Sequence, residues 1–285
     1  MNKILGTLIP IGGNEDKGHE NEDEGFDFIT DGILSRVVKE SGGSEAKIIV
    51  IPTASSVPDR VAENYKKAFS KLGCTQVSVL NLNKPEQANE EKNNNLLQEA
   101  KCIMFSGGNQ SKISSTIAGT KFHKLLADKY LNEDFIIAGT SAGAMAMAYD
   151  MIAGGSSTES MLKGAVILRN GLGLIPELII DTHFIKRGRF GRLAEAIATH
   201  PRLIGVGLAE DTGLVIKNGS EFEVIGSGMV IIFDGSQLTH NAHDQLEDGT
   251  PMSISNLTTH ILANGDHFNL KNRKIEVLPL HAAFV

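Results

Sequence analysis

The sequence predicts an α/β protein with a doubly wound, mostly parallel sheet and antiparallel strands added towards the C-terminal end. In the first half of the 285-residue chain, apolar runs without clean alternation are separated by segments with helical spacing. That pattern is typical of strands covered on both faces. From Ile204 onwards, short apolar runs are separated mainly by glycine turns, which indicates antiparallel pairing. Neither a repeat nor a linker divides the chain, so we expect one domain over residues 1–285.

The expected elements of the first half alternate between strands and helices. The strands are 4–9, 47–51, 76–80, 102–105 and 135–138, and the helices are 26–41, 58–72, 86–100, 111–118 and 122–131. Glycines end the first two helices, and a proline closes the second strand. The later strands are 178–180, 204–208, 214–216, 221–225 and 229–233. Residues 236–258 are polar and are interpreted as a surface excursion, and the acidic run 20–24 as a solvated loop rather than a metal site.

Composition narrows the range of partners and cofactors. The formal net charge of −7 argues against a nucleic acid or an anionic membrane as partner. Cys74 and Cys102 lie in or beside apolar segments and are expected to be reduced core residues. We find no signal peptide and no membrane-spanning stretch, so the expected location is the cytoplasm. Because no Walker A sequence, dinucleotide fingerprint or zinc-ligand spacing is present, we expect no cofactor and no metal.

The most informative stretch is residues 139–143, Gly-Thr-Ser-Ala-Gly. It follows an apolar strand and precedes a helix-forming segment, which is the setting of a nucleophile elbow. Small residues permit the sharp turn that exposes the Ser141 hydroxyl, and the helix offers unpaired N–H groups to an oxyanion. The alternative is a glycine-rich strand-to-helix turn whose role is only structural packing.

His183 is the candidate base for this serine. It directly follows the apolar strand 178–180, and parallel α/β sheets form their sites at the carboxyl ends of strands. A hydrogen-bonded structural histidine is the alternative. The orienting carboxylate is either Glu210 or Asp211, since both end another apolar strand, and spacing alone does not choose between them.

Two further features flank the candidate triad. Arg187, Arg189 and Arg192 follow the histidine closely, and arginine suits bidentate recognition of carboxylates. The alternative is an exposed basic helix face with modest ion pairs. The loop 107–110 ends the strand before the elbow strand and is able to present a backbone N–H to an oxyanion. Its alternative role is an ordinary strand–helix connection with Asn109 as the N-cap.

Together these residues resemble the cyanophycinases, in the serine peptidase family that also contains the aspartyl dipeptidase called peptidase E. The resemblance covers nearly the whole chain and is carried by residues 6–13 with 15–17, 50–55, 105–110, 139–144, 181–193 and 207–212. The arginine segment combined with the serine elbow is specific to cyanophycinase within the larger group.

The resemblance implies a fold like that of class I glutamine amidotransferases, which is flavodoxin-like, and a homodimer. It implies a Ser–His–Glu triad of Ser141, His183 and Glu210. From the loop 107–110 and the start of the following helix, we expect the oxyanion hole at Gly108 and Ala142. It also implies that the residues lining the substrate cleft are Gln110, Asp181, Thr182, Arg187, Arg189 and Arg192.

The activity implied is intracellular exopeptidase cleavage of cyanophycin to β-Asp-Arg dipeptides. Cyanophycin is a poly-aspartate backbone with arginine on each β-carboxyl, so each repeat carries a carboxylate and a guanidinium. At Thr182 the family usually has glutamine, and this departure leaves open a related peptidase that acts on short Asp-containing peptides. A relative that binds peptides without catalysis is a third reading, and the presence of all three triad residues argues against it.

Overall fold

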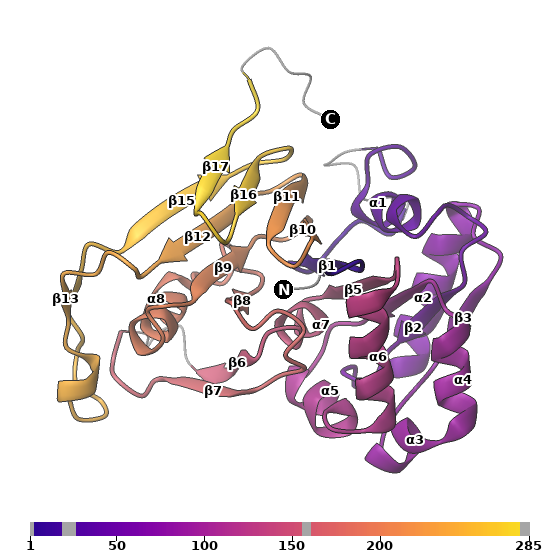
Figure 1. The fold of residues 1–285 in the computed structure, drawn as a ribbon, viewed down its shortest axis with the longest axis horizontal. Coiled ribbons are helices and arrows are strands. Elements are labelled where there is room, and N and C mark those ends of the chain that lie inside the picture. Colours follow the sequence, from indigo (N-terminus) through magenta and orange to yellow (C-terminus); the bar gives the residue numbers. More distant parts are fainter. Residues whose placement is uncertain (1–2, 19–26, 156–160, 280–285) are drawn as a thin grey trace.

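The computed structural model describes residues 3–18, 27–155 and 161–279 (Figure 1). Over these residues the central sheet has nine strands in the order β17-β16-β11-β10-β1-β5-β4-β2-β3. Its parallel part consists of β1 (Thr7–Ile11), β2 (Ile48–Ile51), β3 (Val77–Val79), β4 (Cys102–Phe105) and β5 (Ile136–Thr140). The predicted fold class, a mostly parallel sheet with antiparallel additions, is therefore confirmed.

Helices cover both faces of the parallel strands. One face packs against α1 (Ile33–Glu40) and α2 (Pro58–Lys71), and the other against α3 (Pro85–Asn89), α4 (Glu91–Glu99), α5 (Gln110–Ile117) and α6 (Lys121–Asn132). Neighbouring residues of a strand enter opposite cores: Ile9 joins the α1–α2 side and Leu8 the other side. Both are fully buried, which explains why these strands lack polar alternation.

The C-terminal half is mainly antiparallel. The strands that extend the central sheet are β10 (Thr212–Lys217), β11 (Glu221–Gly226), β16 (His267–Asn269) and β17 (Lys274–Glu276). A second sheet, of four strands in the described part of the chain, has the order β15-β12-β9-β8. It consists of β8 (Leu178–Asp181), β9 (Ile204–Leu208), β12 (Val230–Asp234) and β15 (Thr258–Leu262), and α8 (Phe190–Thr199) contacts β9, β12 and β8. Only the β8–β9 pair of this sheet is parallel.

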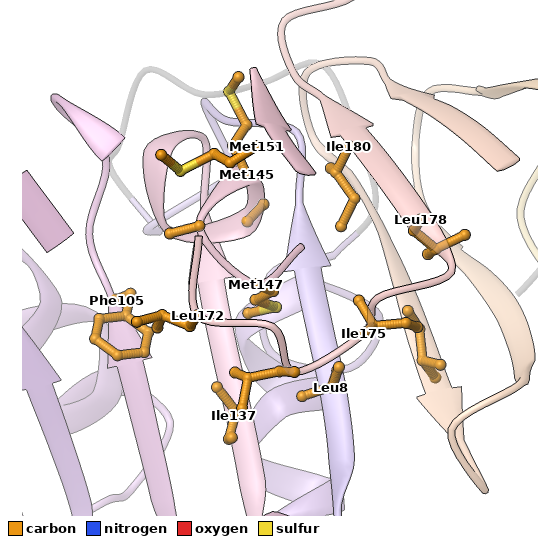
Figure 2. Close-up of a cluster of buried hydrophobic side chains, with 14 of the residues drawn as sticks. Leu8, Phe105, Ile137, Met145, Met147, Met151, Leu172, Ile175, Leu178 and Ile180 are labelled. Carbon is orange, nitrogen blue, oxygen red and sulfur yellow. The ribbon is translucent and has the colours of Figure 1, made fainter. Parts of the chain in front are cut away.

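A shared apolar core joins the two sheets. Figure 2 shows Met147 and Ile175 between Ile137 of the central sheet and Leu178 of the second sheet. The short helix α7 (Ala142–Met145) follows β5 and is fully buried. The ends of β5 and β8 are therefore fixed relative to each other by packing, although they belong to different sheets.

Several elements differ from the sequence prediction. The first helix begins at Ile33, because the Asp27 carboxylate accepts the N–H groups of Ile29 and Thr30 and forms a turn instead. The expected helix 86–100 is two helices, since Glu90 is extended, with ψ of 135°. The hairpin of β6 (Asp150–Gly155) and β7 (Val166–Asn170) was not predicted, and neither were β15, β16 and β17.

The remaining expectations concern the surface and the cysteines. The polar excursion contains β13 (His240–Asn241), the 3-10 helix η1 (His243–Gln245) and β14 (Ile254–Ser255). Cys74 and Cys102 are buried and free, as expected. The acidic run 20–24 lies outside the described residues. None of the helices in the described ranges has the length and apolar character that a membrane crossing requires.

Candidate active site

Three strand ends bring the candidate residues together. Ser141 directly follows β5, His183 lies two residues beyond β8, and Glu210 lies two residues beyond β9. The serine is thus supplied by the central sheet, and the histidine and the carboxylate by the second sheet. The site lies where the two sheets meet.

Ser141 occupies a strained turn between β5 and α7. Its φ is +50° and its ψ is −108°, a conformation that side-chain-bearing residues rarely adopt. A Cβ on Gly139 would lie 2.7 Å from the Gly143 carbonyl carbon, and a Cβ on Gly143 would lie 2.6 Å from the Phe105 oxygen. Both glycines are therefore required for the close approach of α7 to β5 and β4, which is the structural basis of the elbow.

The imidazole of His183 bridges the serine and the glutamate. Its Nε2 lies 3.0 Å from Ser141 Oγ, and its Nδ1 lies 2.7 Å from Glu210 Oε1. These are the contacts expected of a base that is oriented by a carboxylate. The Glu210 side chain is 22% exposed, and its second oxygen accepts from Lys186 Nζ at 2.9 Å.

Asp211 has a different position from Glu210. Its backbone N–H donates to Gly13 O, and its carboxylate accepts from Ser227 Oγ at 2.5 Å. The structure thus resolves the ambiguity between the two acidic residues: Glu210 contacts the imidazole, whereas Asp211 holds the turn that follows β9.

The pKa values of the pair favour a neutral imidazole beside a charged carboxylate. Burial lowers the pKa of His183, the hydrogen bond to Glu210 opposes this, and Arg187 acts in the same direction as burial, so the pKa lies below its ordinary value. Burial acts to raise the pKa of Glu210, but hydrogen bonds from Lys186, His183 and Asn14 outweigh it and bring the pKa to about 2. His183 is therefore suited to accept a proton at neutral pH.

The loop after β4 lies against the serine. A Cβ on Gly107 would be 3.4 Å from the Cβ of Ser141. Gly108 has a φ of +140°, and a Cβ there would lie 2.1 Å from Ala54 O, so only glycine fits. Asn109 is also the N-cap of α5, since its side chain accepts from the Ser111 N–H at 2.9 Å. The predicted oxyanion donors, Gly108 and Ala142, thus lie on the loop beside Ser141 and at the start of α7.

The arginine segment divides into two parts. Arg187 is exposed and lines the cleft beside Ser141. Arg189 and Arg192 instead bind the carboxylate of Asp181, which is fully buried. The expectation that Asp181 and all three arginines face the substrate is therefore wrong for Asp181 and Arg192. The side chain of Arg189 is only 14% exposed and is also bound to Asp181. A buried carboxylate needs such partners.

Two other predicted substrate contacts are also engaged elsewhere. Gln110 donates from Nε2 to Ile152 O at 2.7 Å. Thr182 is fully buried, with its hydroxyl 3.4 Å from Met145 Sδ and its N–H on Asp181 Oδ1 at 2.8 Å. Thr182 therefore has no surface for a substrate to contact, and the expected role is wrong for this residue.

A cleft of about 550 Å³ opens beside Ser141 and His183. Its walls also contain residues that sequence reasoning did not single out as site residues, namely Asn14, Glu15, Lys17, Val61, Asn64, Tyr65 and Thr140. Glu15 and Lys17 belong to a stretch that carries the family resemblance, which is the one signal that points to them, and Asn14 lies just outside that stretch. The α2 residues had none, since an amphipathic helix does not reveal which polar residues reach a site.

A serine on a strained strand-to-helix turn, hydrogen-bonded to a histidine that a carboxylate orients, is the arrangement by which serine hydrolases are recognised. The family model described as Peptidase family S51 matches residues 23–224. The chain belongs to this peptidase family.

Curated relatives of similar length carry the name cyanophycinase. The one from Geminocystis herdmanii is 35% identical over 271 residues, covering 95% of this chain and 96% of the relative. Those from Trichormus variabilis and Synechococcus elongatus are 35% and 33% identical, covering 94% and 95% of this chain and 87% and 81% of their own lengths.

Two solved structures share the fold. A peptidase from an acI-B1 Actinobacterium superposes with a TM-score of 0.67 at 18% identity, covering 94% of this chain and 98% of its own. A putative peptidase E protein from Listeria monocytogenes has a TM-score of 0.50 at 18% identity, covering 78% and 98%. At this identity the likeness concerns the fold alone.

Proposed function

We propose that this chain is a serine exopeptidase that hydrolyses cyanophycin to β-Asp-Arg dipeptides, with Ser141, His183 and Glu210 as its triad. The observation that carries the proposal is the imidazole of His183 within hydrogen-bond distance of both Ser141 and Glu210. The cyanophycinase relatives, matched over nearly their whole length, support the choice of substrate.

The proposed mechanism follows from the protonation states. Neutral His183 accepts the Ser141 proton at Nε2 while Oγ attacks the scissile carbonyl, and Glu210 stabilises the resulting imidazolium. Backbone N–H groups of Gly108 and Ala142 stabilise the oxyanion. The imidazolium then protonates the leaving amine, and water hydrolyses the acyl-enzyme by the same base.

The charge of the cleft favours substrates with free carboxylates. Arg187 lines it with an exposed guanidinium, whereas Lys17 pairs with the Glu15 carboxylate, which is inaccessible to solvent. Arg187 is the arginine that we assign to a substrate carboxylate, because its planar guanidinium suits bidentate pairing.

Incubation of the purified protein with insoluble cyanophycin granules tests the substrate. We expect the suspension to clear and mass spectrometry to detect β-Asp-Arg as the main product, with Ser141→Ala as the inactive control. Binding to granules without any product would instead support a non-catalytic peptide-binding relative.

The second candidate is a peptidase that acts on short Asp-containing peptides. The departure from the family's usual glutamine at Thr182 keeps it open, although Thr182 itself is buried and offers no surface to a substrate. Arg187, which lines the cleft, suits any peptide carboxylate. Release of amino acids from aspartyl dipeptides, with granules left intact, would favour it. The cytoplasmic location and the homodimer remain predictions from the sequence.

A further inference from the structure

The end of β1 and the loop that follows it bond to each segment that carries a residue of the candidate triad. The carbonyl oxygens of residues 11–13 accept, in order, the backbone N–H groups of Ser141, His183 and Asp211, at 2.8, 2.8 and 2.9 Å. All three donors have positive φ angles, of 50°, 48° and 46°. Residues other than glycine hold such angles only where neighbouring structure fixes them. Ile11, the last residue of β1, and the loop after it thus supply one such fixing hydrogen bond at each of the three strand ends.

The loop also packs directly onto the triad. A Cβ on Gly13 would lie 2.4 Å from Cε1 of His183, and one on Gly12 would lie 1.8 Å from Ala209 O. The next residue of the loop, Asn14, helps to lower the pKa of the Glu210 carboxyl. Displacement of the loop would therefore change the position of all three triad residues together.

A buried carboxylate ties this loop to the serine strand. Glu15, whose side chain is inaccessible to solvent, accepts from Thr140 Oγ1 at 2.6 Å, from the Tyr65 hydroxyl, and from Lys17 Nζ at 3.0 Å. Burial acts to raise the pKa of Glu15, but Lys17 and the hydroxyl donors outweigh it and lower the pKa, so the group is charged. Thr140 directly precedes Ser141, so one carboxylate links the loop, β5 and α2.

We propose that Glu15 is a positioning residue, whose buried carboxylate fixes the loop 11–17 against Thr140 and thereby holds Ser141 and His183 at reacting distance. This role rests on the proposed function, because it presupposes that Ser141 is the nucleophile. The catalytic residues themselves make no contact with the Glu15 carboxylate in the hydrogen bonds of the described residues. Its effect is expected through Thr140 and the loop.

The decisive variants change one hydroxyl group. Thr140→Val keeps the size and the branched shape of a buried strand residue but removes the donor to Glu15. Thr140→Ser restores the donor and serves as the rescue. Thr7→Val is the matched control, since Thr7 is equally buried, at 5% against 6%, and lies at the opposite end of the neighbouring strand β1. Glu15→Gln removes the buried charge itself and is therefore the stronger perturbation. If Glu15→Gln fails to fold, Thr140→Val still tests the proposal.

The readout is covalent modification of Ser141 by an alkyl fluorophosphonate, in which the serine oxygen displaces fluoride. We expect Thr140→Val to lower the maximal modification rate about ten- to a hundredfold, because small misplacements of reacting groups have effects of that size. The half-saturating reagent concentration and the melting temperature should match those of Thr7→Val. Thr140→Ser should recover most of the rate, and folded Glu15→Gln should lose at least as much as Thr140→Val.

Two results would overturn the proposal in distinguishable ways. Equal maximal rates for the wild type and Thr140→Val, or a loss that Thr7→Val shares, would refute the positioning role while leaving the nucleophile assignment intact. A wild-type protein that degrades substrate without reacting at Ser141 would refute the proposed mechanism, and the positioning role with it.

Discussion

His183 and Arg192 belong to the same short segment, yet they face opposite environments. His183 reaches the cleft, where it meets Ser141 and Glu210. Arg192 points inward and binds both oxygens of Asp181, at 2.8 and 2.5 Å, with its side chain only 7% exposed. Sequence proximity to the candidate base thus gives no assurance that a side chain shares its cleft.

The reason for the difference lies in Asp181. This carboxylate ends β8 and is fully buried, so it needs charged partners to offset its lost hydration. Arg192 lies in α8, which packs on β8, and Arg189 adds a bond to Thr182 O at 2.8 Å. The cleft residues should therefore control activity, and the Asp181 cluster (Asp181, Arg189 and Arg192) should control stability.

The largest effect is expected at the nucleophile. Ser141→Ala should lower kcat on the order of 10⁴- to 10⁶-fold, because loss of one triad member disables the unit. The melting temperature should stay close to that of the wild type. Steady-state kinetics and thermal unfolding check both points, and substantial residual activity would refute the serine mechanism.

A loss of stability is expected from the Asp181 cluster. Arg192→Met removes the bidentate partner of a buried carboxylate, so the free energy of unfolding should fall by about 3–5 kcal/mol. Arg187→Met is the control, because it truncates an exposed arginine of the same segment and should change this quantity by no more than about 0.5 kcal/mol. Urea denaturation measures both variants. Equal free energies of unfolding for Arg192→Met and Arg187→Met would show that Arg192 does not stabilise the fold. They would contradict the contrast drawn between the cleft residues and the Asp181 cluster.

The cleft arginine should instead affect substrate preference. Arg187→Lys keeps the charge but loses the planar fork, and charge-assisted bonds are worth roughly 1.5–3 kcal/mol. We expect kcat/KM for free-carboxylate substrates to fall about tenfold to a hundredfold. Amidated analogues should be affected little, and Arg202→Lys, at an exposed site, should change neither. The same loss on both substrate types would argue against carboxylate recognition by Arg187.

The smallest expected effect is on pH dependence. Because the pKa of His183 lies below its ordinary value near 6.5, kcat/KM should rise with pH to a plateau, with its midpoint below that value. Arg187 helps to lower this pKa, so Arg187→Gln should move the midpoint upward. Initial rates across pH 4–8, within the range where the fold is intact, measure the shift. A downward shift of the midpoint in Arg187→Gln would contradict the repulsion between the Arg187 guanidinium and protonated His183.

The sequence predicted the candidate site best where a site residue closely follows an apolar strand. Three apolar strands, each closely followed by polar residues, predicted that Ser141, His183 and an acidic residue, Glu210 or Asp211, would lie at strand ends. The structure brings Ser141, His183 and Glu210 together, although the strands belong to two sheets. The choice of Glu210 over Asp211 followed from the family resemblance, since both end the same strand.

What the sequence did not reveal depends on contacts between distant residues. The inward direction of Arg192 is set by the packing of α8 on β8, which charge spacing does not encode. The Glu15–Thr140 bond joins residues 125 positions apart, so no local motif predicts it. The β6–β7 hairpin was missed for a different reason: β7 is half exposed, and its glycine-rich partner has a bulge that disrupts regular alternation.

The central claim is that Ser141 is the nucleophile of this peptidase, and mapping of a covalent adduct tests it most directly. After reaction with an alkyl fluorophosphonate, intact-mass analysis and peptide mapping should find one adduct per chain, on Ser141. The adduct should be absent from Ser141→Ala and should form far more slowly in His183→Ala. An adduct on another side chain, or continued hydrolysis of cyanophycin by fully unmodified protein in excess reagent, would contradict the account.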